Sequence, residues 1–153
     1  MKLRIARADE AEWINARYAE VRFLPSDLSR EVVVIAEIDG QPAGLGRLVD
    51  VDDRSCELGG MLVFDPFRGR GVARAIIDEL LRHARDRDVY CIPFADLEPL
   101  YAAAGFTPAT DAPDSVREKF EWCQRTYDRP VVLGVRRQSR RSGTKAAALP
   151  PHS

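Results

Sequence analysis

Histidine and cysteine are scarce in this chain, which has two histidines and three cysteines among its 153 residues. Cys56, Cys91 and Cys123 are odd in number, far apart and without Cys-x-x-Cys spacing. A structural zinc site needs closely spaced Cys or His ligands, and a disulfide framework needs paired cysteines. The sequence therefore argues against both frameworks, and we predict that the protein binds no metal.

Long apolar runs are also missing. The two longest, Val32–Ala36 and Gly59–Phe64, stop far short of the about 18 residues that a membrane-spanning helix needs. The N-terminus has no apolar stretch of signal-peptide length. We therefore expect a cytoplasmic protein without a membrane partner.

Acidic residues are absent from the C-terminal end, where five basic residues occur from Arg136 onward. The rest of the chain then carries 18 basic against 24 acidic residues. An acidic body does not suit nucleic acid, but it would tolerate a cationic amine as substrate. Segment 138–153 lacks apolar periodicity, so we predict a disordered basic tail, rather than an interaction arm, after one domain at 1–137.

Hydrophobic periodicity predicts a meander of strands followed by alternating strands and helices. Strands are expected at 3–8, 31–38, 43–49, 55–64, 89–94, 106–109 and 130–135. Helices are expected at 10–22, 72–84, 96–104 and 115–127. Asp9 and Glu12 match a capping box for the first helix, and Asp39-Gly40 predicts a type I′ turn. This order indicates a mixed α/β (α+β) domain.

Glycines interrupt two of the expected strands. Gly44 and Gly46 lie inside the strand at 43–49, where they predict close approach by another backbone. Gly59-Gly60 lies inside the strand at 55–64, where the pair predicts a bulge.

The most informative segment is a glycine-rich loop that joins a strand directly to a helix. It reads Phe67-Arg68-Gly69-Arg70-Gly71-Val72-Ala73. Alternate glycines let the backbone turn tightly, and the N–H groups at a helix start attract phosphate. The loop therefore predicts a phosphate or pyrophosphate site, with a plain glycine-rich connection as the alternative. Neither the Walker A nor the Rossmann pattern fits it.

With this loop the chain resembles the GNAT superfamily of acetyl-CoA-dependent N-acetyltransferases. Arg68-x-x-Gly71-x-Ala73 is similar to the family signature Arg/Gln-x-x-Gly-x-Gly/Ala. A strand that ends Met61-Leu62-Val63 precedes the signature, and an amphipathic helix follows it. Tyr101-Ala102-Ala103-Ala104-Gly105-Phe106 is like the family's Tyr-x-x-x-Gly-Phe. The resemblance covers roughly residues 3–135. It implies that the domain predicted at 1–137 is an N-acetyltransferase domain.

The resemblance implies a fold. It is a central, twisted, mostly antiparallel sheet flanked by helices, with a V-shaped split between the fourth and fifth strands. Gly59-Gly60 would form the bulge of the fourth strand, and N–H groups freed by a bulge can polarise an acetyl carbonyl.

The resemblance also implies acetyl-CoA as co-substrate. The fourth-strand backbone would pair with the pantetheine arm, and the loop N–H groups would hold the pyrophosphate. The expected cofactor-binding residues are Met61, Leu62, Val63, Arg68, Gly69, Arg70, Gly71, Val72 and Ala73. Phe94 stands where many relatives have an asparagine that holds the arm, so we expect the arm to be held differently here.

Acetyl transfer to an amine moves two protons, one from the ammonium and one to the departing thiolate. Tyr101 matches the family tyrosine near the thioester sulfur and is the expected acid; an ordinary half-buried tyrosine is the alternative. Glu57, 11 residues before Arg68, is the expected base. A surface carboxylate, a water relay and the weaker candidate Glu98 stay open as alternatives.

These features predict an N-acetyltransferase acting on a primary amine, of a small molecule, by direct attack in a ternary complex. Acetylation of a protein N-terminus or lysine is one alternative, and a non-catalytic acyl-CoA sensor or interaction module is another. A homodimer also stays open. The helix at 115–127 stands where relatives often have a hairpin. This helix offers a wall for the acceptor pocket, with Trp122 or Tyr127 packing an apolar part of the acceptor and Glu118 or Glu121 meeting a cation. For Phe120 and Trp122, however, we predict core packing.

Overall fold

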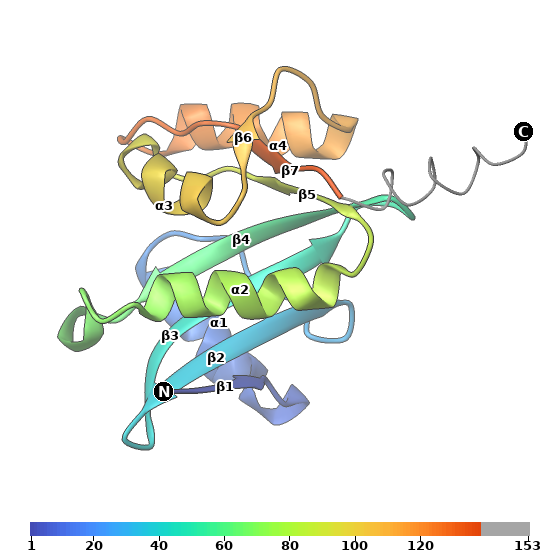
Figure 1. Cartoon of the computed structure of the whole chain (residues 1–153). Coiled ribbons are helices and arrows are strands. Elements are labelled where there is room, and N and C mark those ends of the chain that lie inside the picture. The colour runs from blue at the N-terminus through green and yellow to red at the C-terminus, as the bar shows by residue number, and fades with distance from the viewer. Residues whose placement is uncertain (139–153) are drawn as a thin grey trace, which may run out of the picture.

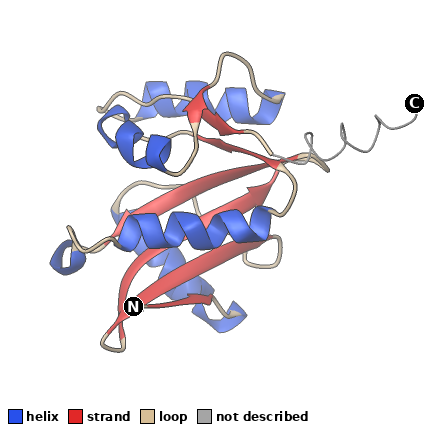
Figure 2. Ribbon diagram, in the orientation of Figure 1, coloured by secondary structure: helices blue, strands red, loops and turns tan. Residues whose placement is uncertain are grey.

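The computed structural model describes residues 1–138 (Figures 1 and 2). Its strands are β1 (Lys2–Ile5), β2 (Glu31–Ile38), β3 (Gln41–Asp50), β4 (Ser55–Val63), β5 (Asp88–Cys91), β6 (Thr107–Pro108) and β7 (Gly134–Arg136). Its helices are α1 (Ala11–Glu20), α2 (Val72–Ala84), α3 (Glu98–Ala103) and α4 (Asp114–Thr126). Each predicted element is present, with ends shifted by a few residues. Of the predicted tail at 138–153, residues from 139 onward lie outside the described part of the chain, while the N–H of Gln138 donates to Asp88 Oδ1 at 2.8 Å.

All seven strands form one sheet in the order β1-β2-β3-β4-β5-β7-β6. Neighbours are antiparallel except β4 and β5, which run parallel. Helix α2 covers one face of the sheet and α1 covers the other (Figure 1). This arrangement confirms the predicted mixed α/β fold with its mostly antiparallel sheet.

The parallel pairing of β4 and β5 is short. It joins Ser55–Leu58 to Asp88–Cys91 and ends there. β4 continues to Val63, so within the described residues the edge from Gly59 to Val63 has no strand beside it on that side. Figure 1 shows the two strands diverging from this point. This divergence is the predicted V-shaped split between the fourth and fifth strands.

The predicted bulge lies in β4. The register with β3 shifts between the pairs Leu45↔Leu62 and Arg47↔Gly59. Gly60 takes a left-handed φ of +59°, which glycine adopts without strain. A Cβ at Gly60 would also lie 2.7 Å from a tyrosine hydroxyl, so both conformation and space require glycine here.

The sheet packs against the apolar face of α2. Val72, Ile76, Ile77 and Leu80 of this helix are almost fully buried, and each such side chain contributes about 1.5–3 kcal/mol by burial. A Cβ at Gly46 would lie 2.6 Å from the Ile76 side chain, so glycine lets α2 sit close to β3. Among residues 1–138 no helix is long and apolar enough to cross a membrane.

The start of α1 differs from the prediction. Asp9 and Glu12 form no capping box, because the chain makes a 3-10 turn at residues 8–10 before α1 begins. Glu10 takes the capping role instead, since its Oε1 accepts a hydrogen bond from the Arg7 N–H at 2.8 Å. The prediction was wrong because Glu10 is also bound from β1, a contact that local spacing does not reveal.

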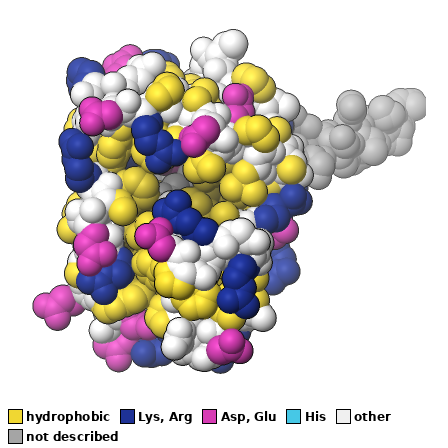
Figure 3. All heavy atoms as spheres, turned by 90° about the vertical axis from the view of Figure 1, so that its left-hand side faces the viewer, with side chains coloured by type: hydrophobic (Ala, Val, Ile, Leu, Met, Phe, Trp, Pro, Cys, Tyr) yellow, Lys and Arg dark blue, Asp and Glu magenta, His cyan; other side chains and the backbone are white. Residues whose placement is uncertain are grey.

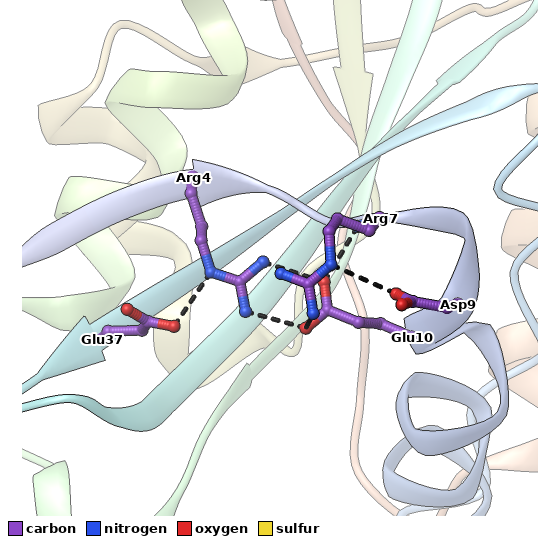
Figure 4. Close-up of polar contacts among 5 residues, drawn as sticks. All are labelled: Arg4, Arg7, Asp9, Glu10 and Glu37. Atoms are coloured by element: carbon purple, nitrogen blue, oxygen red, sulfur yellow. Dashed lines mark hydrogen bonds and ion pairs between the residues drawn. The ribbon is translucent and has the colours of Figure 1, made fainter.

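That contact is an ion-pair cluster centred on Arg4 (Figure 4). Nη1 and Nη2 of Arg4 donate to the two oxygens of Glu10 at 2.8 and 2.7 Å, and Nε donates to Glu37 at 2.9 Å. The bidentate hydrogen bonds from Arg4 lower the pKa of Glu10 to about 2. The cluster thereby ties the start of α1 to β1 and β2.

Glu10→Gln is expected to reduce the free energy of unfolding by about 1–2 kcal/mol at pH 7. Because the pKa of Glu10 is lowered in the folded state, its stabilisation is complete above the unfolded value of about 4.5 and is lost as pH falls toward 2. Urea unfolding at pH 7 and pH 2.5 should show the two proteins converging in acid. Glu12→Gln, at an exposed position, should change stability by less than about 0.5 kcal/mol. An equal loss at both pH values would contradict the charge-based explanation.

Candidate active site

A groove lies beside the split, between the unpaired edge of β4, the start of α2 and α3. It encloses about 660 Å³, a volume typical of small-molecule sites. The predicted cofactor-binding residues that line it are Met61, Leu62, Val63, Arg68, Gly69, Gly71, Val72 and Ala73. Arg70 lies outside this lining, with its guanidinium 5.8 Å from the centroid of the Phe67 ring. Figure 3, which faces this side of the molecule, shows hydrophobic side chains gathered here with basic side chains among them.

The glycine-rich loop has the backbone geometry of an anion site. Gly69 and Gly71 take left-handed φ values of +76° and +80°. The first helical hydrogen bond of α2 runs from the Ala75 N–H to the Gly71 carbonyl, at 3.1 Å. The N–H groups just before Ala75 therefore have no acceptor within the helix, and they carry its partial positive charge. These groups suit a phosphate oxygen.

Two arginines flank the loop in exposed ion pairs. Arg68 lies 3.0 Å from Asp65, and Arg74 lies 3.0 Å from Asp78. Exposed pairs of this kind contribute little stability because water screens them. Either guanidinium is therefore able to exchange its carboxylate partner for a phosphate at small cost.

A second, inner pocket adjoins the groove beneath the bulge of β4. The two cavities share Phe23, Met61, Phe94, Leu97 and Tyr127. The inner pocket brings together Glu57 and Tyr101, the predicted base and acid, although they come from β4 and α3. Trp122 and Tyr127 of the C-terminal part also line it, although core packing was predicted for Trp122, and the centroids of their rings lie 5.7 Å apart.

Tyr101 is deeply buried, with 4% of its surface exposed. Its ring packs edge-on against Phe106 at 5.7 Å between centroids. Burial raises the pKa of Tyr101 well above its usual value, because the phenolate would lose its hydration. The hydroxyl therefore stays protonated at neutral pH, where it has a proton to donate.

Glu57 is buried as well, so the alternative of a surface carboxylate is wrong. Its Oε2 accepts a hydrogen bond from Lys119 Nζ at 2.9 Å. Lys119 belongs to α4 and was not expected in the site. Its spacing from the buried Val116 and Cys123 places it on the inner face of that helix. The exposed Glu118 and Glu121 consequently do not line the pocket.

Arg47 of β3 also lines the inner pocket and was not expected there. Only 4% of its surface is exposed. Its Nη1 donates to the Leu24 carbonyl at 2.8 Å and to Ser26 Oγ at 2.6 Å. The available signal was a single arginine at an inward-facing position of an otherwise apolar strand.

Phe94 lies at the junction of the groove and the inner pocket. Its ring packs against Tyr127 at 5.5 Å between centroids, and the Arg129 guanidinium lies 3.9 Å from its centroid. An aromatic platform thus occupies the position where an asparagine is common in the family that the sequence resembles.

The sequence matches the Acetyltransferase (GNAT) family over residues 3–106. This segment includes β1 to α3, the glycine-rich loop and both Glu57 and Tyr101. A comparison with curated proteins gives no match.

Solved structures share the fold at low sequence identity. Rv2747 from Mycobacterium tuberculosis, in complex with CoA and NLQ, is 20% identical with a TM-score of 0.71, covering 89% of this chain and 98% of that chain. N-acetylglutamate synthase from Neisseria gonorrhoeae, complexed with coenzyme A and N-acetyl-glutamate, is 18% identical with a TM-score of 0.71, covering 90% and 35%. A spermidine N-acetyltransferase SpeG chimera from Vibrio cholerae and hSSAT is 16% identical with a TM-score of 0.68, covering 92% and 98%.

Proposed function

Because the chain belongs to the Acetyltransferase (GNAT) family, we propose that it transfers the acetyl group of acetyl-CoA to the primary amine of a small molecule. The observation that carries this proposal is the inner pocket, which adjoins the groove and is lined by both Glu57 and Tyr101. The pocket is walled by aromatic rings and by α4, which favours a small acceptor over a protein segment.

The groove fits acetyl-CoA by its backbone. The N–H groups at the start of α2 and the loop glycines would hold the pyrophosphate, with Arg68 as a mobile counter-charge. The unpaired edge of β4 from Met61 to Val63 would pair with the pantetheine arm as a further strand would. The bulge at Gly60 leaves backbone groups of β4 outside the regular ladder, where an N–H can polarise the acetyl carbonyl.

Glu57 and Tyr101 would handle the two protons of the reaction. Attack by the neutral amine forms the new N–C bond and breaks the C–S bond of the thioester. Glu57 would accept the proton that the ammonium must lose, directly or through water, with Lys119 holding the carboxylate in place. Tyr101 would donate a proton to the departing thiolate, a role that suits a phenol kept neutral by burial.

Two other functions make different predictions. Acetylation of a protein N-terminus or lysine needs a groove open enough for a peptide, whereas Lys119, Trp122 and Cys123 of α4 wall the inner pocket here. A sensor of acyl-CoA needs no proton donor and acceptor in one pocket, whereas Glu57 and Tyr101 both line it. The related folds include enzymes named for amine acceptors such as spermidine, which supports an amine as acceptor.

Acetyl-CoA is expected to raise the melting temperature and to be turned over only when an amine is present. At 100 times its dissociation constant the ligand should stabilise the fold by about 2.7 kcal/mol. Thiol release is then measured with a panel of small amines and with peptides that have free N-termini. Binding without thiol release would indicate a sensor, and release with peptides alone would indicate a protein acetyltransferase. No thermal shift at millimolar acetyl-CoA would contradict the site assignment.

A further inference from the structure

One buried cation in the inner pocket has an unused hydrogen-bonding edge. Nη1 of Arg47 donates to the Leu24 carbonyl and to Ser26 Oγ. Ser26 is itself held by Asn15, whose Oδ1 accepts from the Ser26 N–H at 2.7 Å and whose Nδ2 donates to the Ser26 carbonyl at 3.0 Å. Nε of Arg47 is buried and has no hydrogen-bond partner. The guanidinium is therefore held firmly by one nitrogen while another donor is left unsatisfied.

Arg47 also lacks a paired counter-ion. Among residues 1–138 no Asp or Glu forms an ion pair with it. Glu31, on the neighbouring strand, acts on the pKa of the nearby Tyr18 through its charge but makes no hydrogen bond to Arg47. The Arg47 guanidinium lies 4.7 Å from the centroid of the Tyr18 ring, a cation–π contact that offsets part of the cost of burial but leaves its Nε–Nη2 edge, the edge that binds carboxylates bidentately, without an acceptor at Nε. Such a group is expected to meet an anion that the protein does not supply.

The unused edge lies next to the proposed reaction centre. A Cβ at Gly59 would lie 3.2 Å from Glu57 Oε2, and a Cβ at Gly60 would lie 2.8 Å from Arg47 Nε. The carboxylate of Glu57 and the guanidinium of Arg47 therefore lie against consecutive residues of the bulge in β4, and both residues line the inner pocket. The buried hydroxyl of Tyr18 also has no hydrogen-bond partner, and it would lie 2.7 Å from a Cβ at Gly60.

The charge of the inner pocket also favours an anionic group on the acceptor. Its charged lining residues are Arg47, Lys119 and Glu57, two cations and one anion. The surplus is positive, although the body of the chain is acidic. A cationic substrate, which the overall composition would tolerate, therefore meets an unfavourable pocket, whereas a carboxylate is attracted.

We propose that the acetyl acceptor is an amino acid, a primary amine with a carboxylate close by, and that Arg47 binds this carboxylate while the amine lies at Glu57. The inference rests on the proposed acetyltransferase function and defines its substrate class. The aromatic lining of the pocket would contact the remainder of the acceptor. Arg47 is then the residue that selects the substrate.

The test is a comparison of matched acceptors with the unmodified protein. Turnover is measured with the proteinogenic amino acids and, for each one that reacts, with its amide and its decarboxylated amine; spermidine completes the panel. The carboxylated form should have a kcat/KM about 100-fold higher, because a site built for a buried polar group rejects analogues that lack it. Equal or faster turnover of amines without a carboxylate would overturn the inference while leaving the acetyltransferase function intact. If no amine is acetylated, both the acetyltransferase function and the inference about the acceptor are wrong.

Arg47→Met provides an independent measurement. It should lower kcat/KM for the amino acid about 100-fold, mainly by raising KM, and should lower kcat/KM for the decarboxylated amine far less. Arg47→Lys keeps the charge but not the bidentate edge, so its kcat/KM for the amino acid should lie between those of the parent and Arg47→Met. Arg54→Met, in the exposed turn between β3 and β4, is the matched control. An equal loss for both acceptors would overturn the role of Arg47, and if Arg47→Met fails to fold, the acceptor comparison above decides.

Discussion

Gly71→Glu is expected to abolish acetyl-CoA binding while the folded protein persists. Gly71 has a left-handed φ of +80° immediately before α2, and the new side chain would place a carboxylate at the helix start where we propose the pyrophosphate binds. The like charge would repel the phosphates and cancel the positive end of the helix dipole. We expect affinity to fall at least about 100-fold, from the combined loss of several charge-assisted hydrogen bonds. Calorimetric titration with acetyl-CoA measures this directly.

Gly40→Glu is the matched control for backbone strain. Gly40 has a φ of +75° in the hairpin turn between β2 and β3, and a Cβ meets nothing within 4 Å there, as at Gly71. Both substitutions should therefore cost about 1–2 kcal/mol of stability through the left-handed conformation. Only Gly71→Glu should lose acetyl-CoA. If the two variants bind acetyl-CoA equally well, the pyrophosphate lies elsewhere.

Tyr101→Phe is expected to lower kcat by about 10²–10⁴-fold, the usual contribution of a positioned acid. The substitution keeps the ring that packs on Phe106 and deletes only the hydroxyl. Because burial raises the pKa of Tyr101, the phenol is protonated throughout the neutral range. The loss should therefore be about the same from pH 6 to pH 9. Affinity for acetyl-CoA, measured by titration, should change little.

Tyr90→Phe is the control for removing a buried tyrosine hydroxyl. Tyr90 is as buried as Tyr101, but it packs with Val116 and Val135 and lines neither the groove nor the inner pocket. Its variant should retain parent-like turnover. If Tyr101→Phe does so too, the thiolate takes its proton from water, and Tyr101 has only a packing role.

Short contiguous segments carried most of what the sequence revealed. The glycine-rich loop was predictable because adjacent residues encode both of its features. Gly69 and Gly71 provide the positive φ values, and the apolar stripe that begins at Val72 marks the start of the helix. The bulge in β4 was predictable for the same reason, since Gly60 needs a conformation that other residues rarely adopt. Tyr101 and Glu57 were proposed through a family resemblance, which indicates the positions of such residues but not what surrounds them.

The start of α1 shows where local patterns mislead. Asp9 and Glu12 have the spacing of a capping box, yet Glu10 is the residue used. Its selection depends on Arg4 and Glu37, which reach it from two strands. A side chain that could cap a helix can also bind other residues that the fold brings near it. A pattern of a few neighbouring residues does not reveal those partners.

The sequence by itself determined the order of the elements, the glycine-rich loop, the split sheet and the acetyl-CoA chemistry, because each follows from neighbouring residues or from the family pattern. Only the tertiary structure decided what surrounds Glu57. Lys119 reaches it across 62 residues of chain, through the rotation of α4 set by its packing. Arg47 lies in the same pocket because β3 and β4 pair with a shift at the bulge. Register and helix rotation depend on the sum of many long-range contacts, so the charge of the acceptor pocket emerges only when the chain is folded.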